Sequence, residues 1–150
     1  MTHDADDRTL EILLVEDNLG DVRLLEMGFD QTNIDETFHV ATDGEEALDF
    51  LFRRDGYESA SHPDVVLLDL NLPKLNGIEV LERMQSRSKL RSVPVVVLTS
   101  SQSEDDRATS LERGASAYLS KPVDPSSFVS LAEAIAEFVD SGRLPEPFAE

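Results

Sequence analysis

The stretch Val65-Val66-Leu67-Leu68-Asp69 places four consecutive apolar residues directly before a carboxylate. Runs of the same kind, rich in β-branched residues, occur at residues 12–15 and 95–98, and weaker runs occur at residues 37–41 and 117–119. Strands that are apolar at every position are typical of a parallel sheet that is covered on both faces. The five runs therefore predict five parallel strands.

Helical spacing fills the segments between these runs. Asp43 and Glu46 form a predicted capping box, and Gly114 stands where a later helix would end. Asp124 is the predicted cap of the last helix, with Pro125 at its first helical position. Five strands that alternate with five helices indicate a doubly wound α/β sandwich with right-handed connections. The predicted core stripes are Ala47, Leu48, Leu51 and Phe52; Ile78, Leu81 and Met84; Ala108 and Leu111; and Phe128, Leu131, Ala132, Ile135, Phe138 and Val139.

The composition fits one domain. The chain has 150 residues, of which 40% are hydrophobic and 29% are charged, which suffices for a single core. We expect this domain at residues 10–140, between a disordered acidic tail at residues 1–9 and a C-terminal tail at residues 141–150. Cysteine is absent, which excludes disulfides and thiol chemistry. No signal peptide and no apolar run near the roughly 20 residues of a membrane helix is visible, so we expect a cytoplasmic protein.

The charge balance is strongly acidic. The chain has 31 Asp and Glu against 13 Lys and Arg, a net charge of −18. Such a surface repels a phosphate backbone, so we expect no binding to nucleic acid. The surplus also favours a halophilic protein of a salt-rich cytoplasm, where a Debye length of about 3 Å screens the self-repulsion.

Polar residues stand at the ends of four of the predicted strands. Glu16 and Asp17 follow the first strand, and Asp69 follows the third. Thr99 ends the fourth strand, and Lys121 follows the fifth. Because ligands bind beyond the carboxyl ends of the strands in such sheets, we expect these side chains to converge on one site.

The expected site predicts its own chemistry. Two carboxylates about 4 Å apart repel by roughly 4 kcal/mol at an effective dielectric constant near 20. Three converging carboxylates therefore need protons or a cation, and an all-oxygen ligand set points to Mg²⁺ or Mn²⁺. A hydroxyl group and a lysine beside such an ion complete the groups that phosphoryl transfer requires.

Each of these residues also has a purely structural interpretation. Glu16 and Asp17 could cap the helix that follows, Thr99 could be an ordinary strand-end hydroxyl, and Lys121 could be a surface lysine. Capping does not explain a third acid on a neighbouring strand, and an unpaired buried Asp69 would be costly. The functional interpretation is therefore favoured. The three histidines share no metal-ligand spacing and are interpreted as incidental: His3, His39 and His62.

The set Glu16-Asp17, Asp69, Thr99 and Lys121-Pro122 resembles the receiver domain of two-component response regulators over roughly residues 10–140. Residues 14–18, 68–73 and 120–124 further resemble single-domain regulators paired with bacteriophytochrome-type histidine kinases. The resemblance implies a (βα)5 flavodoxin-like fold with the strands in the order 2-1-3-4-5. It also implies a phosphorylation-dependent signalling switch that is not an enzyme beyond its own phosphoryl transfer.

The resemblance assigns roles to the acidic residues. Asp69 matches the aspartate that accepts a phosphoryl group from the phosphohistidine of a sensor kinase. Glu16 and Asp17 match the acidic pair that holds Mg²⁺ together with Asp69, and the backbone carbonyl of Asn71 would complete the protein ligands. Glu16 stands where aspartate is common, and Asn71 and Ser101 match positions that tune the lifetime of the phosphoryl group.

The resemblance also implies a switch and its partners. Thr99 matches the hydroxyl that turns toward the phosphoryl group, Lys121 the cation that pairs with it, and Tyr118 the aromatic residue that moves inward afterwards. No output domain is expected after residue 140, so the output would be a protein contact. The expected partners are a sensor histidine kinase of the phytochrome-like type and a second copy bound through the last two strands and the helix after each.

Two alternatives belong to other classes. A Mg²⁺-dependent phosphatase of the haloacid dehalogenase type also combines an Asp nucleophile, a hydroxyl residue, a lysine and paired acids. In that class the acids follow the lysine, and a second Asp stands where this chain has Asn71. The other alternative is a degenerate receiver that acts only as a docking module, which the complete set of site residues disfavours.

Overall fold

The computed structural model describes residues 9–60, 62–100 and 103–145. Its five strands form one parallel sheet in the order β2-β1-β3-β4-β5, which confirms the predicted fold class and strand order. The strands are β1 (Leu10–Val15), β2 (Glu36–Ala41), β3 (Val65–Leu68), β4 (Val95–Thr99) and β5 (Ala117–Ser120). Residues 1–8 and 146–150, which are parts of the predicted tails at residues 1–9 and 141–150, lie outside the described residues, as does the site residue Ser101.

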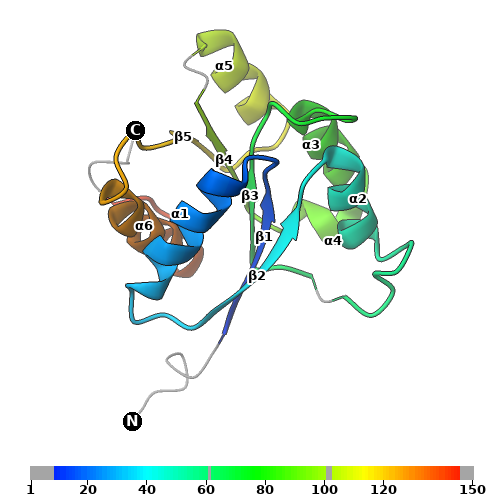
Figure 1. Cartoon of the computed structure of the whole chain (residues 1–150). Coiled ribbons are helices and arrows are strands. Elements are labelled where there is room, and N and C mark those ends of the chain that lie inside the picture. The colour runs from blue at the N-terminus through cyan, green and yellow to red at the C-terminus, as the bar shows by residue number, and fades with distance from the viewer. Residues whose placement is uncertain (1–8, 61, 101–102, 146–150) are drawn as a thin grey trace.

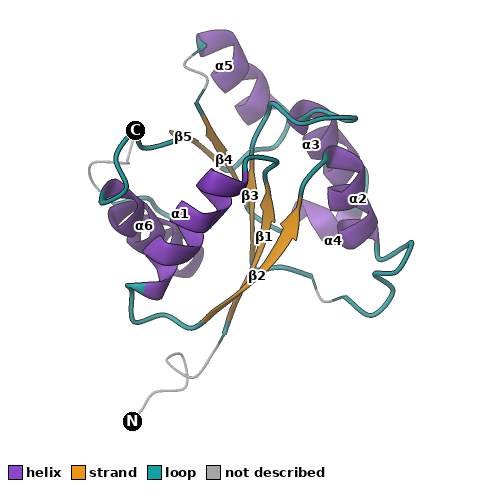
Figure 2. Cartoon of the chain, in the orientation of Figure 1, coloured by secondary structure: helices purple, strands orange, loops and turns teal. Residues whose placement is uncertain are grey.

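Helices cover both faces of the sheet (Figures 1 and 2). Two helices lie on one face, three on the other, and one beyond the carboxyl end of β4, near the top of Figure 1. In that order they are α1 (Leu19–Asp30) and α6 (Ser127–Ser141); α2 (Gly44–Phe52), α3 (Gly77–Gln85) and α4 (Ser88–Arg91); and α5 (Glu104–Glu112).

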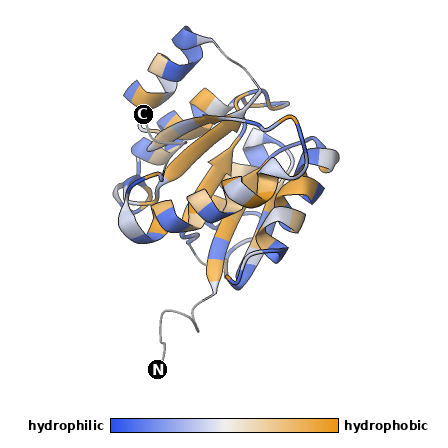
Figure 3. Ribbon diagram, turned by 90° about the vertical axis from the view of Figure 1, so that its left-hand side faces the viewer, coloured by the Kyte–Doolittle hydropathy of each residue, from blue (hydrophilic) through white to orange (hydrophobic). Residues whose placement is uncertain are grey.

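Alternation along the strands divides the core into two clusters. Leu13 and Val15 of β1 pack with α2 and α3, whereas Ile12 and Leu14 pack with α1 and α6. All four residues of β3 and all five of β4 are buried, as expected for a sheet covered on both faces. Figure 3 shows the strands as the hydrophobic centre of the protein.

Some of the predicted helix ends are confirmed. Asp43 caps α2, because its side chain accepts a 2.8 Å hydrogen bond from the Glu46 amide. Glu46 reaches back to the amide of Thr42 rather than to that of Asp43, at 2.9 Å, so the return half of the capping box is shifted by one residue. Gly114 follows α5 with a positive φ of 112°, which confirms it as the glycine that ends this helix.

Other helix boundaries differ from the prediction or were not predicted. The regular helix α6 begins at Ser127 rather than at Pro125, although Asp124 still accepts a 3.0 Å hydrogen bond from the Ser127 amide. The cap of α1 is Asn18, whose side chain accepts from the Asp21 amide. Neither Glu16 nor Asp17 caps that helix. The short helix α4 was not predicted, because four residues cannot show a helical period.

The predicted core stripe of α5 is also wrong. Ala108 is exposed and Leu111 is 39% exposed. Ser110 is the buried residue of this helix, and its hydroxyl donates to the Asp106 carbonyl at 2.7 Å. The hydroxyl can be buried because it is satisfied within the helix. An ion pair between Arg113 and Glu82 joins the end of α5 to α3.

None of the helices that the structure describes has both the length and the apolar character to cross a membrane.

Candidate functional site

The site lies at the carboxyl edge of the sheet, and side-chain alternation selects its face. The residues that directly follow β1, β3 and β5 are Glu16, Asp69 and Lys121. Their backbone amides bond to Ala41, Val15 and Thr99 at 2.9, 3.1 and 2.9 Å. Each continues the alternation whose previous members pack against α1 and α6. The sheet therefore delivers two buried carboxylates and an ammonium group to the same side.

Lys121 is the centre of the polar contacts. Its Nζ atom lies 2.7 Å from Glu16 Oε1, 2.8 Å from Asp21 Oδ2 and 3.0 Å from Asp69 Oδ2. The Lys121 side chain is only 11% exposed. One cation thus joins β1, α1 and β3 to the end of β5, which is the convergence that the sequence predicts for Glu16, Asp69 and Lys121.

Asp21 is a site residue that the sequence analysis missed. It lies in the first turn of α1, three residues after the Asn18 cap. An acid at this position is ordinarily explained by the helix dipole, so the sequence offers no separate signal. Only the packing of α1 against the sheet shows that this carboxylate reaches Lys121.

Burial and crowding set the ionisation of these groups. Burial raises the pKa of Glu16 to about 7, and the charge of Asp69 adds to the effect, although the hydrogen bond with Lys121 opposes it. Burial alone would lower the pKa of Lys121, but hydrogen bonds to Asp21, Glu16 and Asp69 outweigh it and raise this pKa. The ammonium therefore stays charged, and it cannot fully compensate the surrounding carboxylates.

The acids also suit a metal ion. Glu16, Asp17 and Asp69 can each offer one oxygen atom such that the three atoms lie within 4.8 Å of one another. Glu16 and Asp69 are 2% and 6% exposed, whereas Asp17 is exposed. Three converging oxygens without a softer ligand fit a hard cation such as Mg²⁺ or Mn²⁺. Asp17 therefore lies on the open side from which an ion would enter.

Local backbone contacts hold the two buried carboxylates. The Asn18 amide donates to Glu16 Oε2 at 3.1 Å, and the Asn71 amide donates to Asp69 Oδ1 at 3.2 Å. Each acid thus has one oxygen on Lys121 and the other on a backbone amide. Gly77 fixes the loop after β3, since an added Cβ atom would lie 2.6 Å from the Asp69 carbonyl oxygen.

Thr99 and Tyr118 lie on the other face of the sheet. Thr99 is fully buried at the end of β4 and continues the alternation of Val95 and Val97, which pack toward α2 and α3. Tyr118 packs in the same core cluster and is 9% exposed. In the β4–β5 register it lies beside Val97, one step before Thr99 on the same face. The predicted switch pair therefore shares one face, opposite the acid–lysine cluster.

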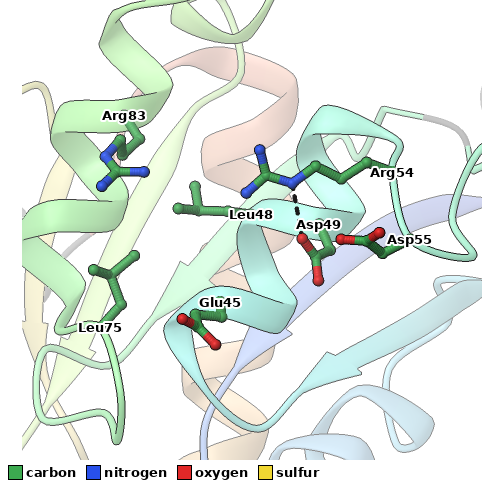
Figure 4. A pocket seen from close by; sticks show the side chains of 7 residues that line it. All are labelled: Glu45, Leu48, Asp49, Arg54, Asp55, Leu75 and Arg83. Carbon is green, nitrogen blue, oxygen red and sulfur yellow. Dashed lines mark hydrogen bonds and ion pairs between the residues drawn. The ribbon is translucent and has the colours of Figure 1, made fainter.

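A hollow between α2 and α3 is a separate feature (Figure 4). It measures about 330 Å³, and its lining includes Glu45, Asp49, Arg54 and Arg83. Arg54 and Asp49 form an ion pair of 2.8 Å across part of it. Its charged groups are exposed or half-buried and of both signs, so we place the functional site at the buried acids of the sheet edge.

Comparisons with known proteins agree with this fold. A family model described as the response regulator receiver domain matches residues 12–133. The response regulator Rcp1 of Synechocystis sp. is 39% identical over 135 residues, which cover 89% of this chain and 92% of Rcp1.

Solved structures give the same result. The manganese-bound form of Rcp1 superposes with a TM-score of 0.81 at 37% identity and covers 91% of this chain and 99% of its own. The phosphorylated cyanobacterial phytochrome response regulator RcpA gives a TM-score of 0.84 at 37% identity, and the match covers 93% of this chain and 100% of RcpA. The bacteriophytochrome response regulator RtBRR gives a TM-score of 0.72 at 43% identity, and the match covers 87% of this chain and 78% of RtBRR. Nothing in these similarities favours a phosphatase of the haloacid dehalogenase type.

Proposed function

The chain belongs to the response regulator receiver domain family, and we propose that Asp69 is the residue through which it receives a phosphoryl group from a sensor histidine kinase. One observation carries this assignment. Asp69 is a buried carboxylate at a strand end that shares the Lys121 ammonium with Glu16 and Asp21. A buried carboxylate in this position lies beside a cation that can stabilise the more negatively charged aspartyl phosphate.

The chain's own residues prepare the carboxylate for attack. The Asn71 amide and the Lys121 ammonium each hold one oxygen of Asp69, so the side chain is oriented before a donor arrives. Orientation of this kind lowers the entropic part of the barrier. In phosphoryl transfer the protein contributes mainly positioning and charge stabilisation.

Glu16, Asp17 and Asp69 are the residues that would hold Mg²⁺, with the Asn71 carbonyl as a further ligand. When bound, the ion supplies positive charge for the phosphoryl oxygens. The manganese-bound form of Rcp1 supports a divalent ion in this family. Glu16 is one methylene longer than aspartate, and its contacts to Lys121 and the Asn18 amide keep the carboxylate close to Asp69.

Phosphorylation would then act as a switch. An aspartyl phosphate carries up to about two negative charges where the Asp69 carboxylate carried one, and the Lys121 ammonium is placed to balance the added charge. We propose that the Thr99 hydroxyl turns toward the phosphoryl group and that Tyr118 adjusts behind it, because both share one face and adjacent strands. Phosphorylation would shift the population from the inactive toward the active state, and the size of this shift is limited by the contacts that differ between the two states.

The partner assignments are part of the same proposal. The similarity to RcpA and RtBRR supports a phytochrome-like histidine kinase as phosphodonor. A second copy would bind through β4, β5, α5 and α6, where the exposed side of α5 carries Leu111. We further propose a cytoplasmic receiver domain over residues 10–140 that binds no nucleic acid, in line with the net charge of −18.

The test is labelling with a small-molecule phosphodonor in the presence of Mg²⁺, followed by intact-mass spectrometry. The wild-type chain should take up one phosphoryl group, and Asp69→Asn should take up none. Asp49→Asn, which removes a carboxylate from the outer side of α2, is the control and should label like the wild type. Persistent labelling of Asp69→Asn would refute the acceptor, and sustained turnover of a phosphate ester would instead favour a phosphatase.

A further inference from the structure

A second charged surface lies at the amino edge of the sheet, at the opposite end from Lys121. There α2 ends after Phe52, His62 leads into β3, and α4 precedes β4. A hollow of about 350 Å³ opens between these segments. We call it the α2–α4 pocket, and its lining includes Phe52, Arg53, His62, Arg87, Lys89 and Leu90.

The charge of the α2–α4 pocket is opposite to that of the whole chain. The protein carries 31 acidic residues against 13 Lys and Arg, yet no carboxylate lines this hollow in the part of the chain that the structure describes. Arg53, Arg87 and Lys89 also form no ion pair with any described residue. The hollow in Figure 4 differs, because acids accompany its arginines. These cations pair with none of the carboxylates that the structure describes, so an anionic ligand from outside can supply the missing charge.

The pocket is held in shape before any ligand binds. The Phe52 ring contacts two guanidinium groups, with Arg87 Cζ at 4.3 Å and Arg54 Cζ at 5.0 Å from its centroid. Such stacking fixes a guanidinium while its N–H edge stays available. Arg53 ends α2 with a φ of 58°, a conformation that favours glycine or asparagine. Leu51 and Leu90 form the buried base of the pocket, each 2% exposed.

We propose that the α2–α4 pocket binds an acidic peptide segment of a partner protein. Arg53 ends α2, whereas Arg87 and Lys89 lie at the start of α4 and within it, so several carboxylates along one extended segment can pair with these cations at once. Apolar side chains of the segment would cover Phe52 and the aliphatic parts of Arg87 and Lys89. A single small anion would engage fewer of these groups. The proposal concerns a surface remote from Asp69 and does not rest on its phosphorylation.

The test uses the full chain and a fluorescein-labelled synthetic peptide of repeating Glu-Glu-Leu, with binding measured by fluorescence anisotropy at low salt. Wild-type protein should bind, and Arg53→Gln/Lys89→Gln should bind about fivefold more weakly or worse. The matched control is Arg23→Gln/Arg143→Gln, which removes two exposed cations elsewhere and changes the net charge equally. It should bind like the wild type. All three proteins should retain phosphodonor labelling at Asp69, so a failure here is distinguishable from a failure of the proposed function.

A second readout reports on the pocket itself. Burial and the nearby charges of Arg53 and Lys89 lower the pKa of His62. Carboxylates bound beside it should raise this pKa again, as followed by NMR of the imidazole protons. The proposal is overturned if the wild type does not bind the peptide, if both double variants weaken binding equally, or if the pKa of His62 is unchanged on binding. It is also overturned if inorganic pyrophosphate displaces the peptide and binds more tightly, because the ligand would then be a small phosphate.

Discussion

The Nζ atom of Lys121 lies 2.8 Å from the Oδ2 atom of Asp21, although 100 residues separate them in the chain. This contact ties α1 to the end of β5 and adds a third carboxylate to the two that Lys121 already meets. Asp21 lies at the margin of the acidic site, with its side chain 24% exposed. It therefore contributes negative charge to the site while remaining outside the proposed ligand set.

Asp21→Asn should weaken Mg²⁺ binding without abolishing phosphodonor labelling. The substitution removes one negative charge beside the site, and Lys121 is then shared by Glu16 and Asp69 alone. We expect the dissociation constant for Mg²⁺ to rise about fivefold, a partial effect because Asp21 is screened by solvent. NMR titration of backbone amides with Mg²⁺ measures it. Asp30→Asn, at the other end of α1, is the control, and an equal loss in both variants would contradict a local role.

Glu16→Gln should make the stability of the metal-free protein less sensitive to pH. The pKa of Glu16 is about 7 in the folded protein against 4.5 for the free side chain. Between these values the folded protein holds a proton that the unfolded chain has released, so raising the pH favours unfolding. Wild-type stability should fall by on the order of 1 to 3 kcal/mol from about pH 5 to pH 7 on this account.

Urea unfolding in EDTA at several pH values gives the measurement. Glu45→Gln, which changes an exposed acid on α2, should keep the wild-type slope. A slope in Glu16→Gln as steep as in the wild type would show that Glu16 is not the group that titrates.

Gly77→Ala should destabilise the protein and disturb the loop after β3. A Cβ atom there would lie 2.6 Å from the Asp69 carbonyl oxygen and 2.8 Å from Leu70 Cα. Both are backbone atoms that cannot turn aside, so we expect a cost of about 1–3 kcal/mol and slower labelling of Asp69. In Gly20→Ala the new Cβ meets only the Asn18 side chain, at 3.2 Å, and the change should stay within about 1 kcal/mol. Equal effects of the two substitutions would be inconsistent with a specific close approach.

Salt should stabilise the protein, and Glu36 should account for part of the effect. Burial, a hydrogen bond with Asp30 and the charges of Asp30, Asp35 and Glu26 raise the pKa of Glu36 to about 7. Such crowding is relieved when a Debye length of about 3 Å in molar salt screens the charges. The thermal midpoint should therefore rise from low salt to molar KCl, and it should rise less in Glu36→Gln than in Glu133→Gln. A midpoint that does not respond to KCl would count against a halophilic protein.

Local sequence determined the sheet and most of its helices. Runs such as Val65–Leu68 can be satisfied only by burial on both faces, and Asp43 and Gly114 mark helix ends through their own backbone chemistry. Where the pattern was weak, prediction failed. Ala108 and Leu111 have helical spacing but face solvent, because the helix buries Ser110 instead. A four-residue helix such as α4 leaves no periodic signal at all.

By itself, the sequence determined that Glu16, Asp69 and Lys121 would meet, because the ends of parallel strands share one edge and residues of equal parity share one face. Only the tertiary structure decided that Asp21 joins them, since that depends on how α1 packs on the sheet. The same holds for the α2–α4 pocket, whose cations come from segments that no local period connects. The positions of the strands and the parity of their side chains are written in short-range patterns, whereas the packing of helices is decided by the fit of whole surfaces.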